Sequence, residues 1–368
     1  MRTRLAVDMG LEFPIFAFTH CRDVAAAVSQ AGGLGVLGVA GHSLDDLRME
    51  LAWIENEVGD KPYGVDLLLP TKFVAGDEAE LDARIPERHR RFVDDLLAKY
   101  DVPALPDAAG VPREFSVGYE EQRDVIELAF EHRISLIASA LGPPPGWMIE
   151  QGRARGVKVA ALAGTVEHAR RHVEAGVDLV VAQGYEAGGH TGEISTMVLV
   201  PEVVDAVSPV PVLAAGGIAN GRQLTAALAL GAQGVWTGSL WLTTEEAETH
   251  PVVKEKFLRA SSRDTVRSRS KTGKPARMLR SAWTEAWEDP ANPDPLPMPL
   301  QPRLVREAEA RIARSAHKSP GAEQLINYFV GQVVGSLREV SSVRSVVESL
   351  VQEYADTMER LDAWAQDE

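Results

Sequence analysis

The stretch that decides the fold is residues 212–237, with the sequence VLAAGGIANGRQLTAALALGAQGVWT. The apolar run at 212–215 predicts a buried strand, and 221–230 has the spacing of an amphipathic helix after a glycine-rich turn. A second apolar run at 234–237 predicts the next strand. A strand, a crossover helix and a second strand form the unit that joins parallel strands. This stretch therefore predicts a parallel α/β sheet.

The same alternation extends towards the N-terminus. Six further strands are expected at 13–18, 34–39, 63–69, 134–139, 158–162 and 179–182. Helices are expected at 23–31, 44–58 (with Ser43 as N-cap), 119–132, 145–155 and 166–175, and a short one after Pro201. Eight such units suit a (β/α)₈ TIM barrel, which takes about 250 residues. The alternative, a doubly wound open sheet, is disfavoured because no GxGxxG follows the first strand.

Two regions depart from the alternation. Residues 70–117 are charged and interrupted by prolines, with one helix expected at 86–100. Such a long connection predicts an excursion after strand 3 over the barrel mouth. We expect a barrel domain at 1–245 and a C-terminal extension at 246–368 that packs over the barrel and active site.

The expected extension contains three segments of different composition. Residues 263–280 are basic and polar with a turn at 272–275, and residues 289–302 are proline-rich. Residues 322–364 have mainly helical spacing, broken near Gly335 and at 341–342. The extension is therefore predicted to be mainly helical.

Composition excludes several classes of function. The net charge of −15 argues against a nucleic-acid partner. The single cysteine, Cys21, excludes an intrachain disulfide and a cysteine-rich zinc site, and the absence of HxH and HExxH predicts no metal. No apolar segment suits a signal peptide or a membrane span, so we expect a cytoplasmic protein without a membrane partner.

The loops after the last two predicted strands have the composition of a phosphate site. Gly216 and Gly217 follow Ala215, and the next helix would present its N-terminus to an anion. Gly238 and Ser239 follow the eighth strand. Phosphate sites in these barrels commonly use this pair of loops. The alternative is that the glycines only make tight turns.

The loop after the sixth strand is the predicted catalytic centre. Residues 183–192, QGYEAGGHTG, place His190 among four glycines. Imidazole can give or take a proton near neutral pH, whereas a purely structural histidine would only bond a loop carbonyl. We favour the catalytic role because active-site residues follow the strands of such barrels. Other histidines are expected on the surface: His89, His132, His168, His172, His250 and His317. Four tryptophans are expected to pack over the barrel, with a subunit interface as the alternative: Trp236, Trp241, Trp283 and Trp287.

These features resemble the nitronate monooxygenase family of FMN-dependent barrels, formerly called 2-nitropropane dioxygenases. The matching segments are AGGLG at 31–35, GYEAGGHTG at 184–192, AAGGI at 214–218, TGKPAR at 272–277 and GQ at 331–332. The resemblance implies a flavin oxidoreductase in which FMN supplies the electron chemistry.

The resemblance also implies residue roles. His190 would act near the flavin as acid, base or substrate-orienting group, with His20 and Lys274 as substrate contacts. The implied cofactor-binding residues are Ala17, Phe18, Thr19, Asp66, Gln183, Gly184, Gly188, Gly189, Ala215, Gly216, Gly217, Gly238 and Ser239.

Two departures from the family pattern bear on the substrate. Residues 17–20 are AFTH where the family has a Gln-Ala-Pro-Met-like stretch, and Asp66 stands where it has Asn. An ionised Asp66 would add negative charge near an anionic substrate, which disfavours a small nitronate. Three functions therefore stay open: oxidation of an alkyl nitronate by O₂, NAD(P)H-dependent reduction of a quinone or enoyl thioester, and flavin binding without turnover. The partners expected are a small-molecule substrate with O₂ or NAD(P)H, and a homo-oligomer is left open.

Overall fold

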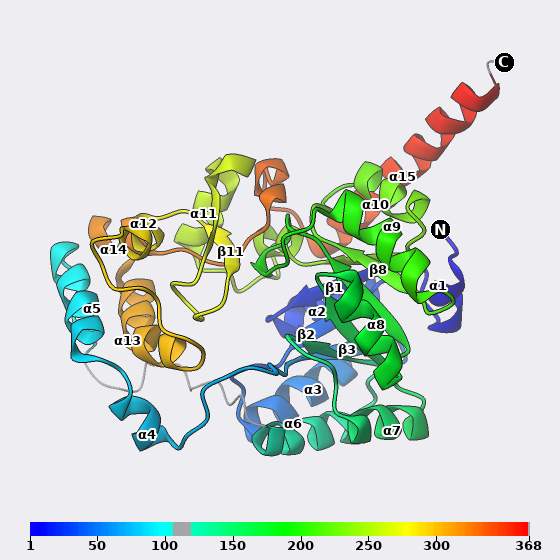
Figure 1. Cartoon of the computed structure of the whole chain (residues 1–368). Coiled ribbons are helices and arrows are strands. Elements are labelled where there is room, and N and C mark those ends of the chain that lie inside the picture. Colours follow the sequence, from blue (N-terminus) through cyan, green and yellow to red (C-terminus); the bar gives the residue numbers. More distant parts are fainter. Residues whose placement is uncertain (106–118, 367–368) are drawn as a thin grey trace.

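A computed structural model of the chain describes residues 1–105 and 119–366. In this part of the chain, eight parallel strands form a closed barrel in the order β1-β2-β3-β4-β5-β6-β8-β9 (Figure 1). Their bounds are β1 (Ile15–Thr19), β2 (Leu34–Gly38), β3 (Tyr63–Leu68), β4 (Leu136–Ala140), β5 (Lys158–Ala163), β6 (Leu179–Gln183), β8 (Val212–Ala215) and β9 (Gly234–Thr237). Because β1 pairs with β9, the ring closes and the open-sheet alternative is excluded. The predicted TIM barrel is confirmed.

Helices follow the strands and cover the outside of the barrel. They are α2 (Arg22–Gln30), α3 (Leu44–Val58), α6 (Tyr119–Glu131), α7 (Gly146–Arg155), α8 (Val166–Ala175), α9 (Thr196–Val207) and α10 (Gly221–Ala229). Ser43 caps α3 as predicted, accepting a hydrogen bond from the Asp46 N–H at 3.1 Å. The prediction of a short helix after Pro201 is wrong about where the helix begins. It begins at Thr196, whose N–H is bound by the Glu186 carboxylate at 2.9 Å.

The eighth barrel helix comes from the end of the chain. The last helix, α15 (Val343–Gln366), packs against α10 and α2, which flank the eighth position of the ring. Residues 244–342 are therefore inserted between β9 and its helix. The region expected as an extension over the active site thus supplies one helix to the outside of the barrel.

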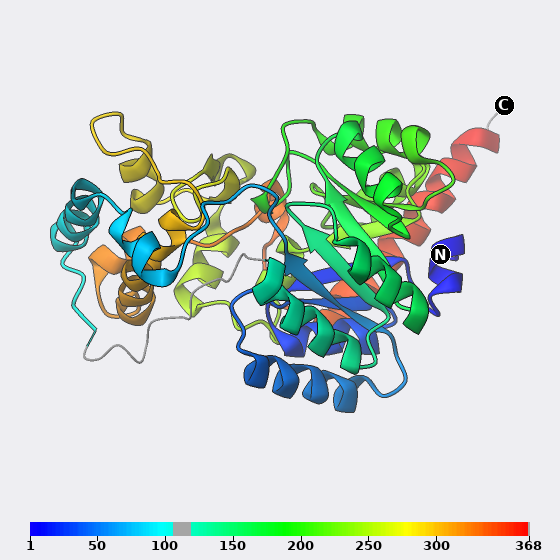
Figure 2. The same ribbon diagram turned by 60° about the horizontal axis from the view of Figure 1, so that its bottom comes forward.

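The inserted residues and residues 70–105 together form a second body, which we call the cap (Figures 1 and 2). Helices α4 and α5 contact α13, and Phe92 packs edge-on against Trp287 with ring centroids 4.8 Å apart. The cap elements are α4 (Glu78–Ala83), α5 (Glu87–Lys99), α11 (Pro251–Arg259), β10 (Thr265–Ser268), β11 (Ala276–Leu279), α12 (Ala282–Glu288), α13 (Leu300–Ser315) and α14 (Pro320–Leu325). Residues 106–117 of the predicted excursion lie outside the described residues.

Short elements complete the structure. They are α1 (Arg4–Asp8), β7 (Gly189–His190), and the 3₁₀ turns η2 (Ser239–Thr243), η3 (Ser262–Asp264) and η4 (Gln332–Ser336). The turn predicted at 272–275 connects β10 to β11 in a hairpin, and β11 pairs with β7. The helix predicted from 322 is wrong over 326–331, where the chain is extended and Phe329 bridges to Met278 on β11.

Strand alternation sorts the core into two layers. Phe16, Leu34, Val181 and Leu213 point into the barrel, whereas neighbours such as Ala17 point outwards under the helices. The four tryptophans expected to pack are buried, at 5% exposed or less: Trp236, Trp241, Trp283 and Trp287.

Two histidines expected at the surface are buried. The Nε2 atom of His89 lies 2.9 Å from the Asp294 carbonyl, and that of His172 lies 3.1 Å from the Leu162 carbonyl. Each ring is buried because it binds a carbonyl of a neighbouring segment. Over the described residues, we find no helix with both the length and the apolar character that a membrane span requires.

Candidate active site

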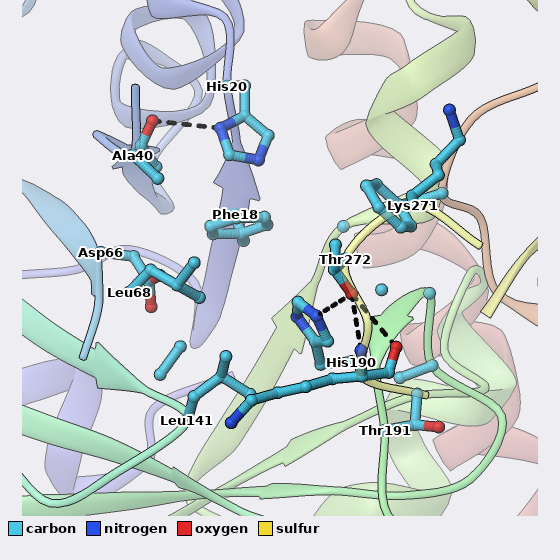
Figure 3. A pocket seen from close by; sticks show the side chains of 18 of the residues that line it. Phe18, His20, Ala40, Asp66, Leu68, Leu141, His190, Thr191, Lys271 and Thr272 are labelled. Carbon is cyan, nitrogen blue, oxygen red and sulfur yellow. Dashed lines mark hydrogen bonds between the residues drawn. The ribbon is translucent and has the colours of Figure 1, made fainter. Parts of the chain in front are cut away.

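A cavity of about 1900 Å³ lies between the carboxyl ends of the barrel strands and the cap (Figure 3). Pockets for single small ligands are commonly about 300–1,000 Å³. The cavity therefore has room for a cofactor and a second molecule. Its position agrees with the rule that active sites of such barrels form at the carboxyl ends of the strands.

Most of the predicted site residues line this cavity. They are Phe18, Thr19, His20, Asp66, Gln183, Gly188, Gly189, His190, Ala215, Gly216, Gly217, Gly238, Ser239 and Lys274. Ala17 and Gly184 do not. Ala17 points outwards from β1, and a Cβ on Gly184 would collide with Thr196, so glycine there serves packing inside the loop.

The loop carrying His190 is held from both sides. Glu186 accepts two hydrogen bonds from Thr196, from N–H and from Oγ1, both at 2.9 Å. Arg277 on β11 is buried and donates to the Tyr185 carbonyl through Nε and Nη2, at 3.1 and 3.0 Å. Its guanidinium also stacks over the Tyr185 ring at 4.3 Å. Glu186 and Arg277 are thus used to position the loop.

The hydrogen bonds around Thr272 determine the tautomer of His190. The Thr272 hydroxyl accepts from the Lys274 N–H at 3.3 Å and donates to the Lys274 carbonyl at 3.1 Å. Its remaining lone pair faces His190 Nε2 at 2.9 Å (Figure 3). When the hydroxyl proton of Thr272 is given to the Lys274 carbonyl, His190 Nε2 is the donor of this contact. The Nδ1 atom of His190 is then an unprotonated base.

The charge of His190 follows from its surroundings. Burial, with the positive charge of Lys274 as a second cause, lowers the pKa of His190 to about 4. The ring is therefore neutral at pH 7 and able to accept a proton. Burial and the charge of Lys72 lower the pKa of Lys274 from its ordinary value.

His20 occupies the opposite wall of the cavity. Its Nδ1 donates to the Gly38 carbonyl at 3.1 Å, because a carbonyl can only accept, so Nε2 is left as an acceptor. Burial lowers the pKa of His20. His20 and His190 are thus two neutral imidazoles facing one cavity.

Asp66 is the exceptional polar group of the cavity floor. It is only 6% exposed, and its Oδ2 atom has no hydrogen-bond partner among the described residues. Burial raises the pKa of Asp66 well above its ordinary value. Burial thus favours the protonated form of this carboxyl, which can donate a hydrogen bond.

The residues predicted to bind phosphate lie together on the cavity wall. Gly216 and Gly217 have φ of +93° and +73°, a backbone conformation that favours glycine. Ser239 Oγ accepts from the Gly331 N–H at 2.8 Å and keeps its own proton for another partner. The expected role of the α10 N-terminus is wrong, because the Gly221 N–H there binds the Glu353 carboxylate of α15 at 2.8 Å.

Comparison with known proteins matches this arrangement to one family. The family model for nitronate monooxygenase matches residues 12–353. The chain belongs to the nitronate monooxygenase family. It is therefore a flavin-dependent oxidoreductase.

Relatives of this family member cover its whole length. A Mycobacterium tuberculosis protein named "putative monooxygenase" is 61% identical over 100% of both chains. The solved nitroalkane oxidase from Streptomyces ansochromogenes is 27% identical, with a TM-score of 0.80 over 97% of this chain and 99% of that one. FabK from Thermotoga maritima is 30% identical, with a TM-score of 0.74 over 99% of each chain.

The cavity of this family member fits a flavin on two observations. A Cβ on Gly189 would meet no atom within 4 Å, and one on Gly238 would meet only Phe18, at 3.8 Å. Both glycines thus leave open space on the cavity wall, where a ligand could approach the backbone closely. Asp66 offers an unsatisfied polar group at the floor.

Sequence reasoning missed the partners that hold the catalytic loop. Thr272 and Arg277 lie in the TGKPAR segment but carried no predicted role, and Glu353 was not singled out. The basic residue inside a strand-like stretch, Arg277, was a usable indication of a buried partner. Nothing local marks Thr272 as the partner of a histidine 82 residues away.

Proposed function

We propose that this protein is an FMN-dependent nitronate monooxygenase-like enzyme that oxidises an alkyl nitronate with O₂. The observation that carries the proposal is the pairing of neutral His190, with its free Nδ1, and cationic Lys274 on one cavity wall. A lysine attracts an anionic substrate, and a neutral imidazole can orient it or take its proton.

Within this proposal, the residues divide between the two ends of FMN. Gly216, Gly217, Gly238 and Ser239 would bind the phosphate, and Phe18, Asp66, Gln183 and Gly189 would line the ring. FMN would supply the electron transfer when bound, while the protein supplies position and electrostatics. Ala17 and Gly184 are left out of this set.

The environment of Asp66 removes an objection to an anionic substrate. An ionised carboxylate at the floor would repel a nitronate, but burial raises the pKa of Asp66 and so favours its neutral form. The positive charge of Lys274 is then not opposed by Asp66. This supports an anion as substrate.

A second candidate function is favoured by the size of the cavity. About 1900 Å³ is near the upper end of the usual volumes for two ligand pockets, which leaves room for a second ligand larger than a small nitronate. An NAD(P)H-dependent reductase acting on a quinone or an enoyl thioester would use more of this space. His20, on the opposite wall, would face the larger substrate.

Anaerobic mixing separates the two functions. The purified yellow protein is mixed with propionate 3-nitronate, NADH or NADPH, and the flavin absorbance is followed. We expect bleaching by the nitronate and recovery on adding O₂. Bleaching by NAD(P)H alone would replace the proposal with the reductase function, and a colourless protein that cannot be reconstituted with FMN would refute both.

The cellular setting is also a proposal. We infer a cytoplasmic enzyme of small molecules, which the free, buried Cys21 supports because reducing compartments preserve thiols. Recovery of the activity in a cytosolic fraction would test this location.

A further inference from the structure

The neighbours of Asp66 on the sheet offer its carboxyl group no side-chain hydrogen bond. On β3, Val65 and Leu67 point outwards into the helix layer, so alternation turns Asp66 towards the barrel axis. Its partners in register are Gly38 on β2 and Ala138 on β4. Neither has a side chain that can donate a hydrogen bond. The carboxyl therefore cannot be satisfied from either side.

Leaving such a group unpaired is costly. A buried polar atom without a partner destabilises a protein, and such atoms are rare in folded chains. Leu or Asn at this position would avoid an unpaired acid. An unsatisfied carboxyl that faces a large cavity is best explained by a ligand that completes its hydrogen bonding.

The ring of strands places Asp66 opposite the phosphate end. Strand β3 lies four strands from β8 in either direction around the barrel. Gly216 and Gly217 follow β8 directly. A cofactor held by its phosphate at those glycines and extending across the mouth would bring the far edge of its ring towards β3. In a flavin, that ring carries carbonyl oxygens and ring nitrogens, which are hydrogen-bond acceptors.

We propose that Asp66 meets the flavin as a neutral carboxylic acid, donating a hydrogen bond to an acceptor of the ring, and that this proton makes FMN retention depend on pH. The inference rests on the proposed FMN site. Burial, which raises the pKa of Asp66, agrees with the neutral form. An ionised Asp66 would offer the ring only acceptors and a negative charge.

Other ionisable groups line the same cavity as Asp66, among them Lys72, whose charge acts on Lys274. The segment after β1 brings His20, and the segment after β2 brings His42, while β4 (Leu136–Ala140) has no ionisable side chain. The opposite wall brings His190 and Lys274. Burial keeps both His20 and His190 neutral above pH 7. We expect the loss of FMN on raising the pH to come from Asp66. Lys274, whose pKa is lowered by burial and by Lys72, can also lose its charge, and the Asp66→Asn variant separates the two groups.

The test is the dissociation constant of FMN, measured from the fluorescence of released cofactor between about pH 6 and pH 9. For the wild type we expect a constant value at low pH, then a rise of about tenfold per pH unit above the ionisation of Asp66, since only the protonated form binds well. Asp66→Asn should show no rise, because an amide donates at every pH. Asp66→Ala should bind more weakly at every pH, also without a rise.

A matched control is Asp45→Asn, because the Asp45 side chain is 98% exposed on α3. It should keep the wild-type profile. Identical profiles for wild type and Asp66→Asn, or a flat wild-type profile, would overturn the inference while leaving the FMN site standing. Failure of the wild type to bind FMN at any pH would instead refute the proposed function.

Discussion

Two regions of the cavity, the Thr272–Arg277 segment on its cap side and Asp66 on its floor, differ in how their polar groups are satisfied. On the cap side, Thr272 has all its hydrogen-bonding positions occupied and Arg277 binds both Tyr185 and Thr265. On the floor, Asp66 has an oxygen with no partner in the described part of the chain. The hydrogen bonds on the cap side hold the loop of residues 183–192 in place. On the floor, a bound ligand could supply the hydrogen-bond partner that Asp66 lacks.

This difference predicts which substitutions change the stability of the protein and which change its function. Polar groups on the wall should show their effect in folding and in the geometry of His190, whereas groups around the floor and phosphate end should show it in cofactor binding. Four substitutions test this division.

The largest effect is expected for His190→Asn. This change removes the base while keeping a similar size, so FMN should stay bound while turnover falls at least ~10²-fold. Stopped-flow reduction and FMN content measure the two properties. In the wild type, the acid limb of kcat/KM should lie near pH 4, because burial lowers the pKa of His190 to about 4, and activity should persist above it. Unchanged turnover in the variant would leave His190 as a positioning residue.

Arg277→Met should cost about 2 kcal/mol of unfolding free energy. The substitution leaves the Tyr185 carbonyl without its two hydrogen bonds inside a buried region. Urea unfolding measures the change. As a control, Arg259→Met removes a surface ion pair at a side chain 73% exposed and should change stability by less than about 0.5 kcal/mol. Equal effects would show that Arg277 does not secure the loop.

Thr272→Val should lower turnover about tenfold with little loss of stability, because His190 Nε2 loses its acceptor and the Nδ1 base form is no longer favoured. Thr272→Ser should restore turnover, since it keeps the hydroxyl. Thr191→Val is the matched control, because the Thr191 hydroxyl has no partner in the described chain. A loss in Thr191→Val equal to that in Thr272→Val would disprove the tautomer argument.

The smallest effect on the protein itself is expected for Gly238→Ala. The added Cβ meets nothing closer than Phe18 at 3.8 Å, and φ is −130°, so thermal stability without FMN should not change. FMN affinity should fall about tenfold if the backbone there approaches the phosphate. Gly146→Ala, also in open space but on α7, should leave FMN binding unchanged. Unaltered affinity in Gly238→Ala would move the phosphate elsewhere.

Much of this structure was predictable because barrel elements are specified by near neighbours. Alternating apolar runs located every barrel strand to within a few residues, and Ser43 marked the start of α3. The cap was less predictable. Its helices bury faces against segments more than a hundred residues away, as α5 does against α13, and a local pattern does not contain that partner.

The glycine-rich loop shows where prediction from sequence ends. The motif at 184–192 correctly indicated that His190 faces the cavity, but other residues of the motif only support the structure of the loop. Gly184 makes room for Thr196, and Glu186 caps α9. The sequence does not distinguish a glycine or an acidic residue that faces a ligand from one that contacts its own chain.

The sequence by itself determined that this chain is a barrel of parallel strands with glycine-rich loops after the sixth strand and after the last two. Periodicity and turn chemistry act over a few residues and are therefore visible in the letters. Tertiary structure alone decided the charge and tautomer of the reacting groups. Gly38 and Ala138 flank Asp66 in register and offer it no hydrogen bond, and Thr272 reaches His190 Nε2 from the cap. Hydrogen bonding and burial depend on distant segments brought into contact, and these set the protonation of a side chain.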